Sequence, residues 1–488
     1  MYQKEKGSRA YLVSIVMVAV LGGLLFGYDT AVISGAEKGL QAFFKGAKDF
    51  EYTDFWHGFT SSSALIGCII GSGLSGLFAS NIGRKRSLIF AGVCFFLSAW
   101  GSMAPEMYGV LPVGKPSYTL LVVFNLYRIL GGIGVGMASA ICPMYIGEVA
   151  PSNIRGMLVS WNQFAIIFGQ LVVYFVNFII LGNHANPIYD AAGHIANMVD
   201  AQWTIETGWR YMFGSECVPA GLFTILICFV PETPRYLVMT GQDEQALNIL
   251  ARINGYSQAK SIIEDIKNTI TVKTESLFSY GFLCIFVGIM MSVFQQAVGI
   301  NAVLYYAPRI FQDMGMSNPM VQTVIMGVVN ILFTLVAVFT VEKLGRKPLL
   351  IWGSLGMAVG ALGVAVTFGQ PGLGTLTMLS IMVYSASFMF SWGPIAWVLI
   401  AELFPNTIRG AAVAIAVAFQ WVFNFIVSST FVPLFNMHLT RGDDFGHWFT
   451  YGLYGVICVV AALFVWRLVP ETKGKTLEDM TKLWRKQA

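Results

Sequence analysis

Residues 148–156 read Glu-Val-Ala-Pro-Ser-Asn-Ile-Arg-Gly, and residues 402–410 read Glu-Leu-Phe-Pro-Asn-Thr-Ile-Arg-Gly. Two further motifs occur twice at a similar interval. They are Gly-Arg-Lys at 83–85 and 345–347, and Pro-Glu-Thr at 231–233 and 470–472. Each interval is about half of the 488 residues, so the motifs predict an internal duplication of the fold.

The composition indicates a membrane protein. Apolar residues make up 56% of the chain and charged residues only 11%, whereas soluble proteins carry about 25% charged residues. Mean hydropathy is +0.66. This composition argues against a disordered chain, a nucleic-acid-binding domain and a typical cytosolic enzyme, so no nucleic-acid partner is expected.

Twelve apolar stretches are long enough to cross a lipid bilayer, which takes about 20 residues. They begin near Tyr11, His57, Ser87, Tyr118, Gly156, Tyr211, Leu277, Pro319, Leu349, Gly372, Ile408 and His447. Continuous apolar runs of this kind predict helices rather than barrel strands. With both termini on one side, the loops of that side hold 22 Lys and Arg residues and the opposite loops hold 7. Because basic residues concentrate in cytoplasmic loops, both termini are predicted to be cytoplasmic.

The repeated motifs also predict how the helices are grouped. Both copies of each motif fall on one side of the membrane, so each half holds an even number of helices. The predicted fold class is an all-α membrane protein of twelve transmembrane helices, arranged as two six-helix halves with a site between them. The predicted divisions are a first half at 1–230, a cytoplasmic helical linker at 231–276, a second half at 277–469 and a cytoplasmic tail at 470–488. Within the linker, residues 243–253 and 261–270 each predict a short amphipathic helix.

No cofactor, metal site or enzyme chemistry is expected. The seven cysteines fall within predicted spans without metal-ligand spacing, and no disulfide is predicted. Residues 71–76 match the dinucleotide-binding pattern G-x-G-x-x-G, but they lie inside a predicted span with no strand before them. We interpret these glycines, and the GxxxG pairs at 67–71 and 132–136, as positions where helices pack closely. The spans hold no nucleophile–base set.

Three charged residues lie inside the predicted spans, namely Asp29, Arg128 and Glu216. A charge at the bilayer centre costs about 2.5–3.5 kcal/mol on insertion scales and marks a functional candidate. One interpretation is a proton switch, in which protonation of Asp29 frees Arg128 and Glu216 then holds Arg128. A purely structural Asp–Arg pair is the alternative.

A second group of polar residues in the spans is uncharged. It contains Gln163, Gln170, Gln295, Gln296, Asn301, Asn330, Gln420 and Asn424, accompanied by Tyr305, Trp397 and Trp421. Amides both donate and accept hydrogen bonds, as sugar hydroxyls do, so they suit a neutral polyol better than an ion. Hydrogen bonding between helices is the alternative, at about 0.6 kcal/mol per bond. Eight amides on four helices favour a ligand site.

Charged residues also recur near the cytoplasmic ends of both halves. They are Arg84, Glu148, Arg155 and Glu232 in the first half, and Arg346, Glu402, Arg409 and Glu471 in the second. We predict that they form an ion-pair gate between the halves that closes the cytoplasmic side. Simple anchoring of the helix ends by basic residues is the alternative.

Taken together, the motifs resemble the sugar porter family of the major facilitator superfamily over nearly the whole chain. The resemblance is carried by both Gly-Arg-Lys motifs and by Gly27-Tyr-Asp-Thr30, Pro231-Glu-Thr-Pro-Arg235, Gln295-Gln-x-x-Gly-Ile-Asn301, Gly393-Pro-x-x-Trp397 and Pro470-Glu-Thr-Lys-Gly474. It implies a sugar site formed by Gln163, Gln295, Gln296, Asn301, Trp397 and Gln420, with Gln170, Tyr305 and Trp421 nearby. It also implies that Asp29 is the proton acceptor and Arg128 its partner.

The family pattern favours proton symport at one position and is broken at another. Facilitative glucose carriers of the family have an uncharged residue in place of Asp29, and Gln170 is more typical of a D-xylose carrier. The first-half loop motif has Ser80 where Asp or Asn is usual, whereas Glu342 fits the pattern in the second half. The resemblance therefore implies a monomeric inner-membrane transporter that couples proton entry to uptake of a neutral monosaccharide. A proton-independent hexose facilitator is the alternative, and the external loop at 183–209 has no predicted role.

Overall fold

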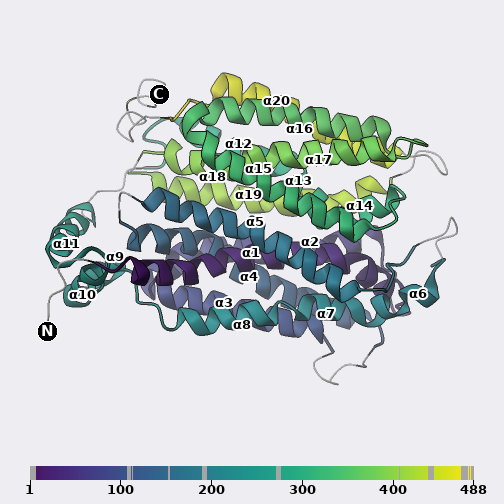
Figure 1. Ribbon diagram of the computed structural model, residues 1–488, viewed down its shortest axis with the longest axis horizontal. Coiled ribbons are helices and arrows are strands. Elements are labelled where there is room, and N and C mark those ends of the chain that lie inside the picture. Colours follow the sequence, from purple (N-terminus) through teal and green to yellow (C-terminus); the bar gives the residue numbers. More distant parts are fainter. Residues whose placement is uncertain are drawn as a thin grey trace.

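The computed structural model describes residues 7–106, 112, 114–151, 154–188, 195–270, 276–405, 407–437, 445–473, 482 and 484. The regular elements within these ranges are helices (Figure 1). The first half contains α1 (Arg9–Lys45), α2 (Asp54–Asn81), α3 (Arg84–Met103), α4 (Tyr118–Val149), α5 (Arg155–Leu181), α6 (Met198–Trp203), the π-helix η2 (Thr204–Gly208), α7 (Trp209–Gly214) and α8 (Cys217–Ile227). The linker contains α9 (Pro234–Met239), α10 (Asp243–Asn254) and α11 (Tyr256–Ile270). The second half contains α12 (Phe282–Ala297), α13 (Ile300–Tyr305), α14 (Ala307–Asp313), α15 (Pro319–Leu344), α16 (Arg346–Thr367), α17 (Gly374–Phe390), α18 (Trp392–Leu403), α19 (Arg409–Phe435) and α20 (Phe445–Leu468).

The predicted all-α membrane fold is confirmed. Within the described residues, eleven spans are long and apolar enough to cross a membrane, and each matches one of the twelve predicted stretches. The sixth predicted stretch, near Tyr211, is the exception because turn residues at 215–216 divide it into α7 and α8. The sequence pattern did not predict this break, which lies next to the buried Glu216.

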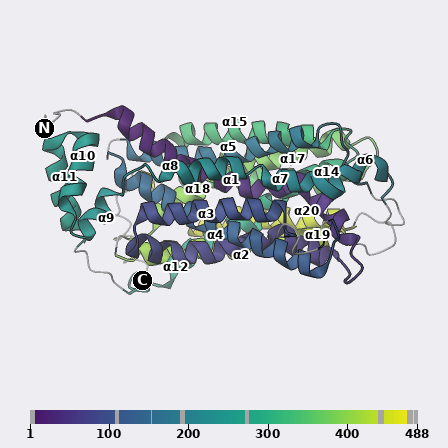
Figure 2. The same ribbon diagram turned by 90° about the horizontal axis from the view of Figure 1, so that it is seen from below.

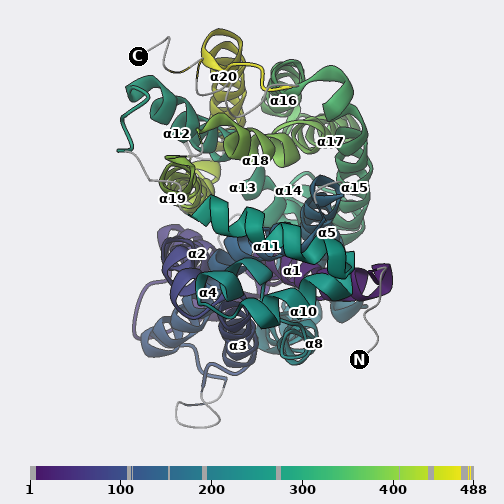
Figure 3. The ribbon, with the colours of Figure 1, turned by 90° about the vertical axis from the view of Figure 1, so that its left-hand side faces the viewer.

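The two halves lie side by side with their long helices running in the same general direction (Figure 1). Helices α9–α11 project from one end of this body, here called the linker end, and α6 and α14 lie at the opposite end (Figure 2). Figure 3 shows the molecule from the linker end, where α10 and α11 are nearest the viewer. The exact domain boundaries at 230, 276 and 469 remain predictions.

Close packing of α2 against α4 explains the GxxxG pairs. A Cβ atom on Gly67 would lie 1.9 Å from the carbonyl oxygen of Ile129, and one on Gly132 would lie 1.7 Å from that of Ala64. Only glycine allows such backbone approach, which is the usual role of small residues in membrane helix pairs. Residues 71–76 are a continuous part of α2, so the dinucleotide-binding pattern there has no strand–turn–helix context.

The linker helices pack on each other and are attached to the first half. Leu237, Leu250 and Ile263 form part of their shared apolar core, which confirms the amphipathic character predicted for the linker. The backbone N–H of Ser8 donates to the carbonyl oxygen of Arg252 at 2.8 Å. The Arg252 guanidinium lies 4.0 Å from the centre of the Tyr11 ring. The start of α1 is therefore fixed to α10.

One break in the second half positions several polar residues. Gly299 has φ +89°, a left-handed conformation that side-chain-bearing residues rarely adopt, and it separates α12 from α13. A Cβ atom there would lie 2.5 Å from the Tyr454 ring. The break places Gln295 and Gln296 at the end of one helix and Asn301 at the start of the next.

Candidate functional site

A cavity lies between the halves and is lined by α1, α5, α12, α13, α17, α18 and α19. Its empty volume is about 570 Å³, including the part open to solvent, which is within the range of small-molecule sites. The lining residues are Phe26, Thr30, Gln163, Ile166, Ile167, Gln170, Gln295, Gln296, Asn301, Leu304, Tyr305, Phe388, Met389, Gly393, Trp397, Gln420, Trp421 and Asn424. This set contains all nine residues that the sequence analysis assigned to the substrate site. None of these lining residues is charged.

Four amide side chains, those of three glutamines and one asparagine, form a continuous hydrogen-bonded chain across the second-half wall. Gln295 Oε1 accepts from Gln420 Nε2 at 2.8 Å and also from the Nε2 of Gln296. Gln296 Oε1 accepts from Asn301 Nδ2 at 2.6 Å. These bonds connect α12, α13 and α19, and they fix which edge of each amide faces the cavity.

Several buried polar atoms in the wall have no partner among the described residues. They are the Oε1 atoms of Gln170 and Gln420 and the indole Nε1 of Trp421. A buried polar atom without a partner costs about 1–3 kcal/mol, so such atoms indicate a place for a ligand. The Trp421 ring also lies 5.5 Å from the Phe26 ring, centre to centre. The cavity thus offers two acceptors, one donor and an aromatic surface to a neutral molecule.

The structure also corrects the membership of the amide group. Asn330 is not in the cavity wall, because its Oδ1 accepts from Ser385 Oγ at 2.6 Å and links α15 to α17. It is the interhelical hydrogen bond that the sequence analysis kept as an alternative. Thr30, Phe388 and Met389 line the cavity but were not predicted, since nothing in an apolar span distinguishes them from lipid-facing neighbours.

Asp29 in α1 and Arg128 in α4 form a buried ion pair. Arg128 Nη1 donates to Asp29 Oδ1 at 2.6 Å, and Nη2 donates to the Asp29 carbonyl oxygen at 3.1 Å. The guanidinium lies 5.0 Å from the centre of the Phe213 ring. Breaking such a pair by removing one partner leaves an uncompensated buried charge, so both charges are held together while Asp29 is ionised.

Glu216 completes the group of buried charges predicted from the sequence. It is fully buried just before α8, within electrostatic reach of both Asp29 and Arg128. Tyr305 connects this group to the cavity, because it lines the cavity and interacts electrostatically with Asp29 and Arg128. Thr30, the residue after Asp29, lines the cavity as well. The ion pair therefore lies directly behind the cavity wall.

At the linker end of the first half, Arg84 Nη2 and Glu148 Oε1 are 2.8 Å apart. Glu232 accepts hydrogen bonds from the backbone N–H groups of Arg84 and Lys85, at 3.1 Å for the nearest oxygen in each case, and so caps α3. Gly83, with φ +94°, makes room for this cap, because a Cβ atom would lie 2.2 Å from Glu232 Oε2. Burial outweighs these hydrogen bonds and raises the pKa of the Glu232 carboxyl.

The second half repeats this arrangement. Arg346 Nη2 and Glu402 Oε1 are 2.9 Å apart, and Thr472 Oγ1 donates to Glu402 Oε2 at 2.6 Å. Glu471 accepts from the backbone N–H groups of Arg346 and Lys347 at 3.1 and 2.9 Å. Burial acts to raise the pKa of Glu471, but the backbone N–H donors outweigh it and the pKa is lowered. The two halves therefore share the geometry of the cap. The pKa of the capping carboxyl, however, is raised in the first half and lowered in the second.

The remaining residues of the predicted gate make weaker contacts. Arg155 is exposed and donates to the carbonyl oxygen of Ala150 at 3.5 Å, and Arg409 interacts electrostatically with Glu402. Glu342 lies in α15, but its side chain is outside the described part of the structure. Among the described residues, the ion pairs at this end join helices of the same half. The ion pairs that the described residues form at this end do not bridge the halves, so the gate between the halves remains a prediction.

Comparisons with known proteins agree with this architecture. The family described as "Sugar (and other) transporter" matches residues 15–484. The D-xylose-proton symporter of Escherichia coli K12 is 47% identical over 97% of this chain and 96% of its own. The glucose facilitated diffusion protein of Zymomonas mobilis is 34% identical over 99% of both chains. The solved inward open conformation of the E. coli xylose transporter XylE matches with a TM-score of 0.82 and 45% identity, covering 97% of this chain and 100% of that one.

Proposed function

The chain belongs to the sugar porter family of the major facilitator superfamily, and from this premise we propose that it is a proton-coupled symporter of a neutral monosaccharide, D-xylose above others. The observation that carries the proposal is the position of the cavity next to the buried ion pair. A cavity lined by uncharged amides with unpartnered polar atoms adjoins a buried carboxylate–guanidinium pair.

The chemistry of the cavity supports a sugar as substrate. Gln163, Gln170, Gln420 and the Gln295–Asn301 chain present both donors and acceptors, which match hydroxyl groups that do both. Trp397 and Trp421 supply apolar faces for the C–H surfaces of a sugar ring. A charged substrate would lack a counter-charge in this wall. The D-xylose-proton symporter similarity favours a pentose.

The buried charges couple the movement of the sugar to the movement of a proton. Asp29 holds Arg128 while it is ionised, and protonation of Asp29 removes the charge that binds the guanidinium. Arg128 itself keeps its charge, and Glu216 is close enough to become its alternative partner. Tyr305 and Thr30 belong to the cavity wall and lie next to the ion pair. Sugar in the cavity and a proton on Asp29 therefore favour the same conformational change, in which the Asp29–Arg128 pair separates. Only a ligand that distinguishes two states can shift their balance, and here the two ligands do so together.

The conformation and orientation follow from charge and shape. The excess of Lys and Arg in the loops of the linker end supports an orientation in which that end, with both termini, lies on the cytoplasmic side of the bacterial inner membrane. The described hydrogen bonds between the halves involve α13, α14 and the end of α19, so the halves meet at the outer end and separate toward the cytoplasm. Similarity to an inward open transporter supports this assignment. The chain acts as a monomer, and charged residues at the linker end, Arg84, Arg346, Glu148 and Glu402 among them, form the cytoplasmic gate in the outward-facing state.

Transport by reconstituted protein tests the function. Asp29→Asn is expected to bind and exchange D-xylose across liposome membranes but to lose accumulation against a gradient, because the variant has no proton acceptor to couple. Addition of sugar to energy-depleted cells should make the medium alkaline with the parent chain and not with the variant. Accumulation by Asp29→Asn would overturn the proton assignment. Net sugar uptake by the parent without any proton movement would show a facilitator instead.

A further inference from the structure

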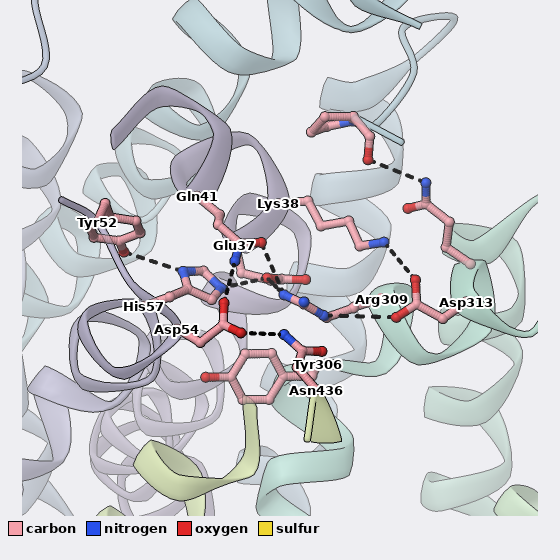
Figure 4. A network of polar contacts seen from close by, with 12 residues as sticks. Glu37, Lys38, Gln41, Tyr52, Asp54, His57, Tyr306, Arg309, Asp313 and Asn436 are labelled. Carbon is pink, nitrogen blue, oxygen red and sulfur yellow. Dashed lines mark hydrogen bonds and ion pairs between the residues drawn. The ribbon is translucent and has the colours of Figure 1, made fainter. Parts of the chain in front are cut away.

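A second group of buried charges lies at the outer end and bridges the two halves (Figure 4). Arg309 in α14 donates through Nη1 to Glu37 Oε2 at 3.4 Å and to Gln41 Oε1 at 3.1 Å, both in α1. Lys38 Nζ, also in α1, lies 3.1 Å from Asp313 Oδ1 in α14. These residues are not part of the cavity lining and do not belong to the Asp29–Arg128 pair, so the function described above leaves them unexplained.

Two further side chains hold Glu37 in place. His57 Nε2 in α2 is 2.8 Å from Glu37 Oε2, and the His57 Nδ1 lies 3.2 Å from the hydroxyl of Tyr52. Figure 4 shows the imidazole between these two groups. A neutral ring that donates from Nε2 and accepts at Nδ1 satisfies both contacts. His57 is thus a positioning residue that aims the Glu37 carboxylate at the second half.

A neighbouring contact connects the same two halves. Asn436 at the end of α19 donates through Nδ2 to Asp54 Oδ2 at 2.8 Å, and α2 packs closely against α19. The charged groups that face one another here include Glu37, Lys38, Asp54, Arg309 and Asp313, with His57 as the titratable ring among them. Lys45 interacts electrostatically with Asp54 and Arg309. Glu37 and Lys38 belong to the first half and Arg309 and Asp313 to the second, so these four side chains lose partners when the halves part at this end.

The burial of this group distinguishes it from surface ion pairs. The side chains of Glu37 and His57 are at most 1% exposed and that of Arg309 is 10% exposed. Buried charges are stable only when paired, and separating the halves would remove the pairing and admit water in its place. Formation of the contacts therefore depends on closure of the outer end.

We propose that Glu37, Lys38, Arg309 and Asp313, with His57 positioning Glu37, form an outer latch that closes the extracellular entrance in the inward-facing state. The latch rests on the transport function proposed above and adds residues to it. Its role is to hold the outer ends of α1 and α14 together while the sugar leaves on the cytoplasmic side. The matching contact at the cytoplasmic end would have to form when this one breaks.

The chain offers a matched control within one half. Glu106, after α3, makes a two-point ion pair with Arg210 of α7, and the side chains are 5% and 14% exposed. This pair resembles Glu37–Arg309 in burial and in residue types. Since it does not bridge the halves, its loss should leave the outer entrance closed.

Accessibility from outside the cell tests the latch. The reporter is Ser61→Cys, because Ser61 is buried in α2 and contacts Tyr306 of the second half. Intact cells are treated with a membrane-impermeant maleimide, with the chain lacking Ser61→Cys as background. Glu37→Gln and Arg309→Gln are each expected to raise the labelling rate by about tenfold, because the outward-open population should rise by the same factor. Arg309→Lys should give an intermediate rate, and Glu106→Gln should equal the parent.

The readout is independent of substrate and proton coupling. Unchanged labelling in Glu37→Gln and Arg309→Gln would overturn the latch, as would an equal rise in Glu106→Gln. If the buried variants fail to reach the membrane, Lys38→Gln tests the more exposed Lys38–Asp313 contact in the same assay. Because labelling needs no transport, failure of the latch and failure of the symport proposal give different results.

Discussion

At the scale of single residues, the Gln295 amide is the centre of the cavity wall. Its one oxygen accepts from both Gln296 and Gln420, and the orientation of both neighbours depends on it. Replacing it with leucine leaves two buried donors without an acceptor in addition to removing a potential sugar contact.

We expect Gln295→Leu to weaken D-xylose binding at least tenfold, which corresponds to about 1.4 kcal/mol. Isothermal titration calorimetry on purified protein measures the change. Asn330→Ala is the control, because Asn330 makes a buried hydrogen bond of similar length outside the cavity. Equal loss of affinity in the two variants would show a general effect on folding rather than a site in the wall.

The residues of the candidate site could be predicted from the sequence to an uneven extent. Amides and charges inside apolar spans are conspicuous because burial in lipid penalises them, and so Gln163, Gln295 and Asp29 could be identified. Phe388 and Met389 could not, since an apolar residue in a membrane helix gives no sign of which face it is on. Asn330 shows that an amide in a span can equally be a structural hydrogen bond.

At the scale of helices, the break at Gly299 decides the shape of the second-half wall. The left-handed backbone and the Tyr454 ring 2.5 Å from a Cβ position both exclude larger residues. Gly299→Ala is therefore expected to destabilise the protein by about 1–3 kcal/mol and to weaken sugar binding, because Asn301 would shift relative to Gln296.

Thermal unfolding in detergent, with sugar binding measured on the folded fraction, tests this expectation. Gly452→Ala in α20 is the matched control, because no described atom lies within 4 Å of its Cβ position. In a helix interior that change should stabilise by about 0.5–1 kcal/mol. A Gly299→Ala protein as stable as the parent would contradict the strain assigned to this break.

Breaks of this kind limit prediction of elements from sequence. Long apolar runs predicted eleven spans correctly because hydrophobic length is a strong signal. The divided spans, α7–α8, α12–α13 and α17–α18, depend on local backbone angles that hydropathy does not encode. At Gly299 the residue type fits the break, because its left-handed backbone favours glycine.

At the scale of the whole molecule, the state of the outer latch and the opening of the linker end are coupled by one motion of the two halves. If the halves rock as rigid bodies, opening one end closes the other. Ser80 and Leu344 are exposed residues at the linker ends of α2 and α15, one in each half, so the distance between them reports the closure of that end.

Spin labels at Ser80→Cys and Leu344→Cys are expected to move closer in an Arg309→Gln background. The exposed Cys228 is changed to serine in all chains to prevent labelling there. Pulsed electron resonance in lipid measures the distance distribution, and Glu106→Gln supplies the unaltered reference. A distance that stays the same while Ser61→Cys becomes reactive from outside would show that the two ends move independently.

The bond between Ser8 and Arg252, with the Tyr11 ring on the guanidinium, has a practical consequence for imaging. It makes the projecting helices α10 and α11 a rigid extension of one lobe in an otherwise featureless detergent-embedded particle. An antibody fragment raised against their outward surface would serve as a fiducial mark that rotates with that lobe alone. Particle images could then be sorted by tilt angle without any substitution inside the bilayer.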